Sequence, residues 1–163
     1  MEQTLLNLSS SVGEALTRGG FTISTAESCT GGLLSHVITA VSGSSAYFVG
    51  GVVAYSNAIK AEVLGVRAST LEAFGAVSEQ TACEMAEGIR VKFGTDVGLS
   101  TTGIAGPTGG TPQKPVGLVW IAISTDGATR AFECHFSGER LEIMRQTVIE
   151  VLSRTLDYLC INK

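Results

Sequence analysis

Residues 21–40 of the 163-residue chain, FTISTAESCTGGLLSHVITA, contain a strand, a turn and a helix in succession. Residues 21–26 predict a short strand, and the small and polar residues 27–32, ESCTGG, predict a turn. Residues 33–40 then predict a helix. A strand that runs directly into a helix is the unit from which parallel α/β sheets are built, so this stretch indicates the fold class.

Periodic apolar residues and capping signals predict helices on both sides of this unit. Gly19-Gly20 is expected to end the first helix. Later helices are expected to start at Ser56 or Asn57, at the capping-box sequence STLE of residues 69–72, at Ser78 and near Glu139. The last helix is expected to bury a stripe made of Leu141, Met144, Val148, Leu152, Leu156 and Leu159.

Further strands are predicted over residues 48–55, 96–101, 116–124 and 128–136. Within the first, Gly50-Gly51 predicts a bulge or a close approach of another segment. The early strands alternate with helices and should pair in parallel, whereas the last two form a hairpin. We therefore expect an α/β fold, a three-layer α/β/α sandwich with a mixed parallel/antiparallel sheet, and a single domain over residues 1–163.

The composition excludes several classes of protein. Hydrophobic residues make up 44% of the chain, charged residues 16%, and the net charge is −4, so neither a nucleic acid nor an acidic membrane is an expected partner. The four cysteines form no C-x-x-C pair, and two histidines are too few for a zinc site, so no metal is expected. The first residues, MEQT, lack the basic start of a signal peptide, and no apolar run is long enough to span a membrane. We expect a cytoplasmic protein with free thiols.

Ser28 lies in the turn after the first predicted strand, where open α/β sheets bind their ligands. A serine at this point can attack a carbonyl group while nearby backbone amides hold the resulting oxyanion. Thr30, Gly31 and Gly32 complete the turn, and amides at the start of the following helix can bind an anion. The alternative is that Ser28 or Thr30 is only a helix cap.

A second loop of small residues, 103–115, follows the third predicted strand. Glycines allow backbone amides to approach a ligand closely, and loops of this kind often bind phosphate. We expect the substrate to contact the segment that contains Thr102, Gly103, Ile104, Ala105 and Gly106. The alternative is a flexible connection between two strands.

A serine nucleophile needs a base, and the two histidines are poor candidates. His36 lies too far along the helix that follows Ser28, and His135 lies in a late strand. Lys60, about one turn into the helix after the second predicted strand, should lie near the strand ends where Ser28 is expected. A buried, neutral lysine can serve as the base, and Tyr55 can orient or relay the proton. The alternative for Lys60 is a solvated surface charge.

A cysteine and two arginines are further candidates for the same site. Cys29 is an alternative nucleophile, because the start of a helix can lower the pKa of a thiol, although a small buried cysteine is the more ordinary interpretation. Arg140 and Arg145, near the start of the last helix, are candidates for a phosphate contact, against the alternative of surface charges. Trp120 and Phe132 are expected in the core.

Taken together, these segments resemble the CinA C-terminal domain family. The resemblance rests on residues 25–32 (TAESCTGG), Tyr55-Ser56-Asn57 with Lys60, residues 75–78 (GAVS), residues 103–107 (GIAGP) with Gly109-Gly110, and residues 114–117 (KPVG). It covers nearly the whole chain in the right order. It implies a three-layer α/β/α domain that hydrolyses nicotinamide mononucleotide to nicotinic acid mononucleotide and ammonia.

Carried over from the family, Ser28 is the nucleophile, Lys60 its base and Tyr55 an assisting group. The implied partner is the mononucleotide substrate, no metal or organic cofactor is required, and a homo-oligomer is compatible with the sequence. Two other functions stay open: a nucleotide-binding or regulatory module without turnover, and an amidase for another small amide.

Overall fold

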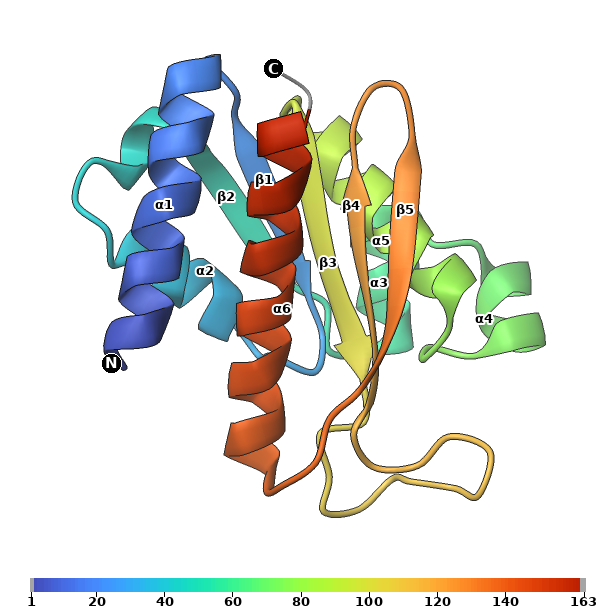
Figure 1. Ribbon diagram of the computed structural model, residues 1–163. Helices are drawn as coiled ribbons and strands as arrows, with labels where there is room; N and C mark the ends of the chain where they lie inside the picture. Colours follow the sequence, from blue (N-terminus) through green and yellow to red (C-terminus); the bar gives the residue numbers. More distant parts are fainter. Residues whose placement is uncertain (1, 162–163) are drawn as a thin grey trace.

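The computed structural model describes residues 2–161, which form a five-stranded sheet between two layers of helices (Figure 1). The strands are β1 (Ile23–Glu27), β2 (Phe48–Val53), β3 (Val97–Gly103), β4 (Leu118–Ser124) and β5 (Thr129–His135). The helices are α1 (Gln3–Gly19), α2 (Leu33–Thr39), α3 (Asn57–Leu64), α4 (Ala68–Phe74), α5 (Glu79–Phe93) and α6 (Arg140–Ile161), with a short 3-10 helix at Ser44–Ala46. This order of elements is the one predicted, apart from the 3-10 helix.

The sheet has the order β2-β1-β3-β4-β5 and is mixed. Strand β1 pairs in parallel with β2 and β3, whereas β3, β4 and β5 pair antiparallel. Helices α1, α2 and α6 cover one face, and α3, α4 and α5 lie on the other (Figure 1). Strand β1 is buried along its whole length because it is central and covered on both faces. The expected three-layer α/β/α sandwich is therefore confirmed.

Most of the predicted helix signals act as expected. Gly20 ends α1 in the left-handed conformation, and the hydroxyls of Ser56 and Ser78 cap α3 and α5 by accepting hydrogen bonds from backbone amides. In its pairing with β1, strand β2 bulges at Val49, one residue before the predicted Gly50-Gly51, and a Cβ at Gly51 would lie 2.2 Å from the Thr25 hydroxyl, so the close approach is found at the predicted place.

Two details of the prediction are wrong. Helix α4 begins at Ala68, before the expected capping box, and the side chain at its N-cap makes no capping hydrogen bond. The Thr70 hydroxyl instead donates to Glu84 of α5, so a tertiary contact replaces the local cap. In α6, Leu141 is 76% exposed and Ile143 is buried in its place, because the side of the first turn that faces the core carries Ile143 and not Leu141.

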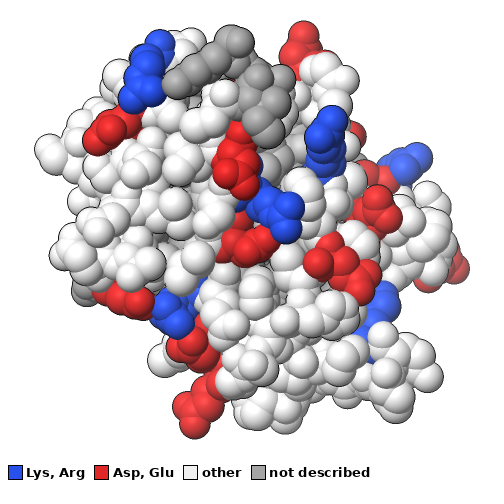
Figure 2. Space-filling view, in the orientation of Figure 1, with Lys and Arg blue, Asp and Glu red and all other residues white. Residues whose placement is uncertain are grey.

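Charged side chains are scattered over the face shown in Figure 2, with acidic and basic groups interspersed among large uncharged areas. This pattern agrees with the small net charge of −4. Within residues 2–161, no helix is both long enough and apolar enough to cross a membrane.

The parallel part of the sheet brings three loops to one edge. Strands β1, β2 and β3 run in the same direction, so their carboxyl ends lie side by side. The turn after β1, the segment between β2 and α3, and the long loop between β3 and β4 therefore meet there, next to the start of α6 (Figure 1).

Candidate active site

The structure brings Ser28 and Lys60 together at this edge. The Lys60 Nζ lies 3.0 Å from the Ser28 Oγ, within hydrogen-bond distance, and also donates to the carbonyl oxygen of Ala54 at 2.8 Å. Ser28 is half-buried, whereas Lys60 is only 1% exposed. The alternative of a solvated lysine is therefore wrong.

Local structure explains how Lys60 reaches the serine. The cap at Ser56 starts α3 directly after β2, so Lys60 lies in the first turn of the helix. The amide of Ala54 donates to the carbonyl oxygen of Glu27 at 2.7 Å, which extends the pairing of β2 with β1 beyond the strand ends. The Lys60 amine thus reaches the turn after β1 from the helix that follows the neighbouring strand, β2.

Burial lowers the pKa of Lys60 below its ordinary value, and the nearby Cys29 thiol acts in the opposite direction. Within residues 2–161, no carboxylate lies close enough to form an ion pair with Lys60, so little opposes the effect of burial. A lowered pKa favours the neutral amine, which is the form that can accept the proton of a serine hydroxyl.

The start of α2 is not open to an external anion, which corrects the expectation from sequence. The amides of Gly32, Leu34 and Ser35 all donate to the carboxylate of Glu27, at 2.8–3.0 Å. Sequence reasoning missed this role of Glu27. Its signal was a carboxylate at the end of an otherwise uncharged strand, followed by a turn rich in hydroxyl groups.

Other parts of the turn also have internal roles. The Thr30 hydroxyl is buried between the Glu27 carboxylate, at 2.6 Å, and the Thr101 hydroxyl, at 2.8 Å. Gly31 and Gly32 adopt left-handed conformations with φ of 61° and 101°, which favour glycine. The structure thus uses these three residues to shape the turn.

Two backbone amides of the turn bond to no oxygen atom within residues 2–161. The amide of Ser28 donates to the carbonyl oxygen of Thr101, and that of Gly31 donates to the carbonyl oxygen of Ser28. By contrast, the amides of Cys29 and Thr30 donate to no oxygen atom in the described part of the chain, and the Cys29 amide interacts only with its own thiol. They lie directly after Ser28, where donors for an oxyanion are usually found.

Arg140 joins three segments of the site. Its guanidinium donates to the Tyr55 hydroxyl and to the carbonyl oxygen of Gly106, both at 2.9 Å. Tyr55 is 63% exposed, and its hydroxyl makes no hydrogen bond to Ser28 or Lys60. Arg145 points elsewhere, because it is paired with Glu2 and Glu142.

The glycine loop is anchored, so the alternative of a flexible connection is wrong. The Lys114 ammonium donates to the carbonyl oxygens of Phe74 and Val77, both at 2.7 Å, and Arg140 holds Gly106 at the other end. The amides of Thr108, Gly109 and Gly110 donate to no acceptor within residues 2–161. The exposed tip therefore offers donors to a ligand.

The beginning of this segment has a structural role instead. The Thr102 hydroxyl donates to the carbonyl oxygen of Ala76, and Gly103 belongs to β3, where a Cβ would lie 2.6 Å from a Val119 methyl group. Ile104 continues the pairing with β4, and Ala105 is buried. The backbone of the loop tip, rather than these residues, is placed to meet a ligand.

The other candidate side chains are not placed for catalysis. Burial raises the pKa of the Cys29 thiol to about 12, so the expected alternative of an activated thiolate is wrong. His36 is exposed on α2, and His135 is exposed and bonded to Glu133. Phe132 and Trp120 are partly buried against core clusters, as expected.

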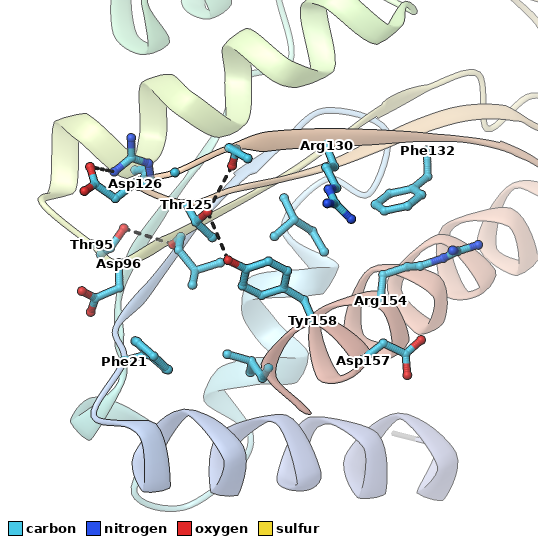
Figure 3. A pocket seen from close by; sticks show the side chains of 16 residues that line it. Phe21, Thr95, Asp96, Thr125, Asp126, Arg130, Phe132, Arg154, Asp157 and Tyr158 are labelled. Carbon is cyan, nitrogen blue, oxygen red and sulfur yellow. Dashed lines mark hydrogen bonds and ion pairs between the residues drawn. The ribbon is translucent and has the colours of Figure 1, made fainter. Parts of the chain in front are cut away.

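A cavity of about 860 Å³ lies away from this site, at the opposite end of the sheet, and Figure 3 shows the side chains that line it. Aromatic and charged side chains from the β4–β5 hairpin, α6 and the segment before β1 line it, among them Phe21, Arg130 and Tyr158. Neither Ser28 nor Lys60 contributes to it.

No group of three or more His, Cys, Asp and Glu side chains within residues 2–161 is arranged to hold a metal ion.

The chain is similar in sequence to proteins that are already known. The chain is 51% identical to a CinA-like protein of Kosmotoga olearia over 93% of its own length, and 50% identical to a putative competence-damage inducible protein of Thermoanaerobacter pseudethanolicus over 98%. It spans 35% and 37% of those two proteins.

Solved structures match over nearly the full length of both chains. A competence/damage inducible protein, CihA, from Agrobacterium tumefaciens is 39% identical, with a TM-score of 0.94 and coverage of 98% of this chain and 97% of its own. A CinA superfamily protein from Klebsiella pneumoniae is 35% identical, with a TM-score of 0.93 and coverage of 96% and 98%. The family model described as CinA C-terminal domain matches residues 5–159. The chain belongs to the CinA C-terminal domain family.

Proposed function

We propose that the chain hydrolyses the carboxamide of nicotinamide mononucleotide to nicotinic acid mononucleotide and ammonia, with Ser28 as nucleophile and Lys60 as base. The observation that carries the proposal is the 3.0 Å contact between the Ser28 Oγ and the amine of a buried lysine that has no carboxylate partner among the described residues. The choice of substrate rests on the resemblance to the family.

The reaction would proceed in two halves through an acyl-enzyme. Neutral Lys60 takes the proton of the Ser28 hydroxyl, and the Oγ attacks the carboxamide carbon. Lys60 then returns the proton to the leaving nitrogen, the carbon–nitrogen bond breaks and ammonia departs. A water molecule, deprotonated by the same amine, attacks the ester and releases the carboxylate and the Ser28 hydroxyl.

The surrounding backbone supports this chemistry. The amides of Cys29 and Thr30, which bond to no oxygen atom within residues 2–161, would donate to the oxyanion that forms on the carboxamide oxygen. The phosphate of the substrate would lie against the loop tip, residues 108–110, with Arg140 beside it. Tyr55 would act through its hydrogen bond to Arg140, by orienting the guanidinium.

A substrate panel tests the proposal. Purified protein is incubated with nicotinamide mononucleotide, free nicotinamide and unrelated small amides, and ammonia is measured. We expect release from the mononucleotide to be at least about 100-fold faster than from nicotinamide, because binding energy from the phosphate and ribose positions the carboxamide. Faster release from another amide would identify a different amidase, and binding without ammonia after long incubation would identify a regulatory module.

Replacing Cys29 with alanine is expected to leave ammonia release within a few-fold of the wild-type rate. With a pKa near 12, the thiol is protonated at neutral pH and is a poor nucleophile. A thiol reagent offered to the native protein should label the exposed Cys160 well before the buried Cys29. A loss of activity of the same size as in Ser28→Ala would contradict the assignment of the nucleophile.

The proposed compartment for this reaction is the cytoplasm. Cys29, Cys83, Cys134 and Cys160 are all free thiols, as expected in a reducing environment.

A further inference from the structure

The buried carboxylate of Glu27 has no part in the proposed chemistry, yet it lies beside the nucleophile. Glu27 ends β1, precedes Ser28 in the chain and is fully buried. Its two oxygens accept five hydrogen bonds, from the Thr30 and Ser35 hydroxyls and from the amides of Gly32, Leu34 and Ser35, at 2.6–3.0 Å. A buried anion is tolerated when donors satisfy it in this way.

All five donors belong to the segment that carries the nucleophile into α2. Three are amides at the start of this short helix, where the helix dipole favours a negative charge. The carboxylate therefore closes residues 28–35 into a loop around itself, and Ser28 lies at the beginning of that loop.

The backbone of Glu27 helps to position Lys60, the partner of Ser28. Its carbonyl oxygen accepts from the Ala54 amide at 2.7 Å, and the Ala54 carbonyl oxygen accepts from the Lys60 amine at 2.8 Å. The side chain of Glu27 thus holds the turn that follows Ser28, and its carbonyl oxygen holds the segment whose Ala54 carbonyl binds Lys60.

We propose that Glu27 is the positioning residue of the site, and that its carboxylate holds the Ser28 hydroxyl at the Lys60 amine. The kinetic part of this inference rests on the proposed function, and the structural part does not. The carboxylate also excludes the substrate's phosphate from the start of α2, because the amides there already have an acceptor.

Glu27→Gln is the informative change, because it keeps the shape and removes one acceptor. On either side of the group, the new NH2 meets a backbone amide that cannot turn away: Ser35 on one side, and Gly32 and Leu34 on the other. The turn must shift to relieve this contact between donors. A displacement of about 1 Å at reacting groups can cost about 100-fold in rate.

Glu84→Gln is the matched control. The Glu84 carboxylate also accepts several hydrogen bonds, from Arg67 and Thr70, but it fastens α4 to α5 away from Ser28. We expect both variants to lower Tm, and only Glu27→Gln to lower kcat by about 100-fold with KM changed less than about five-fold. Equal kcat values in the two variants would overturn the proposal.

A crystal structure of Glu27→Gln provides a readout that does not depend on turnover. We expect the Ser28 Oγ to lie beyond hydrogen-bond distance of the Lys60 Nζ, or to occupy more than one rotamer. If the contact stays at the wild-type 3.0 Å, Glu27 has no positioning role, whatever the activity of the protein. If the contact is lost in a protein whose wild type releases no ammonia, the positioning role holds and the proposed function fails.

Discussion

Replacing Ser28 with alanine is expected to lower ammonia release from nicotinamide mononucleotide by about 10⁴-fold or more, while the variant still folds and binds the substrate. The reason is that the Oγ supplies the bond to the acyl group, and no other activated nucleophile lies at the strand ends. Burial keeps the Cys29 thiol protonated, and Thr30 is held inside the turn by Glu27 and Thr101.

The structural cost of this change should be small. The only hydrogen bond to the Ser28 hydroxyl in the described chain comes from Lys60, which keeps its second acceptor, the Ala54 carbonyl oxygen. Circular dichroism should therefore show a Tm close to that of the wild type, and calorimetry should show substrate binding. Ser11→Ala is a suitable control, because the Ser11 hydroxyl bonds only to a carbonyl oxygen within α1. Activity in Ser28→Ala near the level of this control would eliminate the serine mechanism.

Replacing Lys60 with methionine is expected to reduce turnover by about 10³-fold or more without loss of stability. Methionine is unbranched and apolar, so it can fill much of the buried space of the lysine stem but cannot take a proton. Removing the amine also removes the cost of burying it, and the Tm at neutral pH should stay the same or rise.

Two comparisons make this test specific to the base. Lys60→Arg retains a positive charge that cannot be released, so it should be as inactive as Lys60→Met. Lys92→Met changes an exposed lysine on α5 and should keep wild-type kinetics. Full turnover in Lys60→Arg would show that a neutral amine is not required.

The same lysine predicts how activity and stability depend on pH. Since burial lowers its pKa, turnover should fall as the pH decreases through that lowered value, because the protonated amine cannot accept the serine proton. Stability should change in the same direction. Between the lowered pKa of Lys60 and its ordinary pKa of 10.5, the unfolded chain binds the proton and the folded chain does not. The contribution of Lys60 to the free energy of unfolding therefore increases as the pH rises through this range. Titration of Tm against pH in wild type and Lys60→Met isolates this contribution.

Strand boundaries were less predictable than strand existence. Strand β1 begins at Ile23 rather than at residue 21, and β4 begins at Leu118 rather than at residue 116. In the first case the hydroxyl and amide of Thr22 pair with Asp96 from another loop, so a tertiary contact decides where regular pairing starts. The exposed Leu141 has a similar origin, because periodicity at the end of a helix leaves open which residue of its first turn faces the core, and here that residue is Ile143.

The amino-acid sequence by itself determined the order of strands and helices, the parallel start of the sheet, and hence the edge at which Ser28 and Lys60 meet. Apolar periodicity and turn residues are local, and parallel strands must end at the same edge. Only the tertiary structure decided that Lys60 is buried with no carboxylate partner among the described residues, that the Glu27 carboxylate binds the amides at the start of α2, and that the Tyr55 hydroxyl bonds to Arg140. Those outcomes depend on contacts between segments as much as 85 residues apart, and spacing along the chain cannot specify which partner a side chain finds.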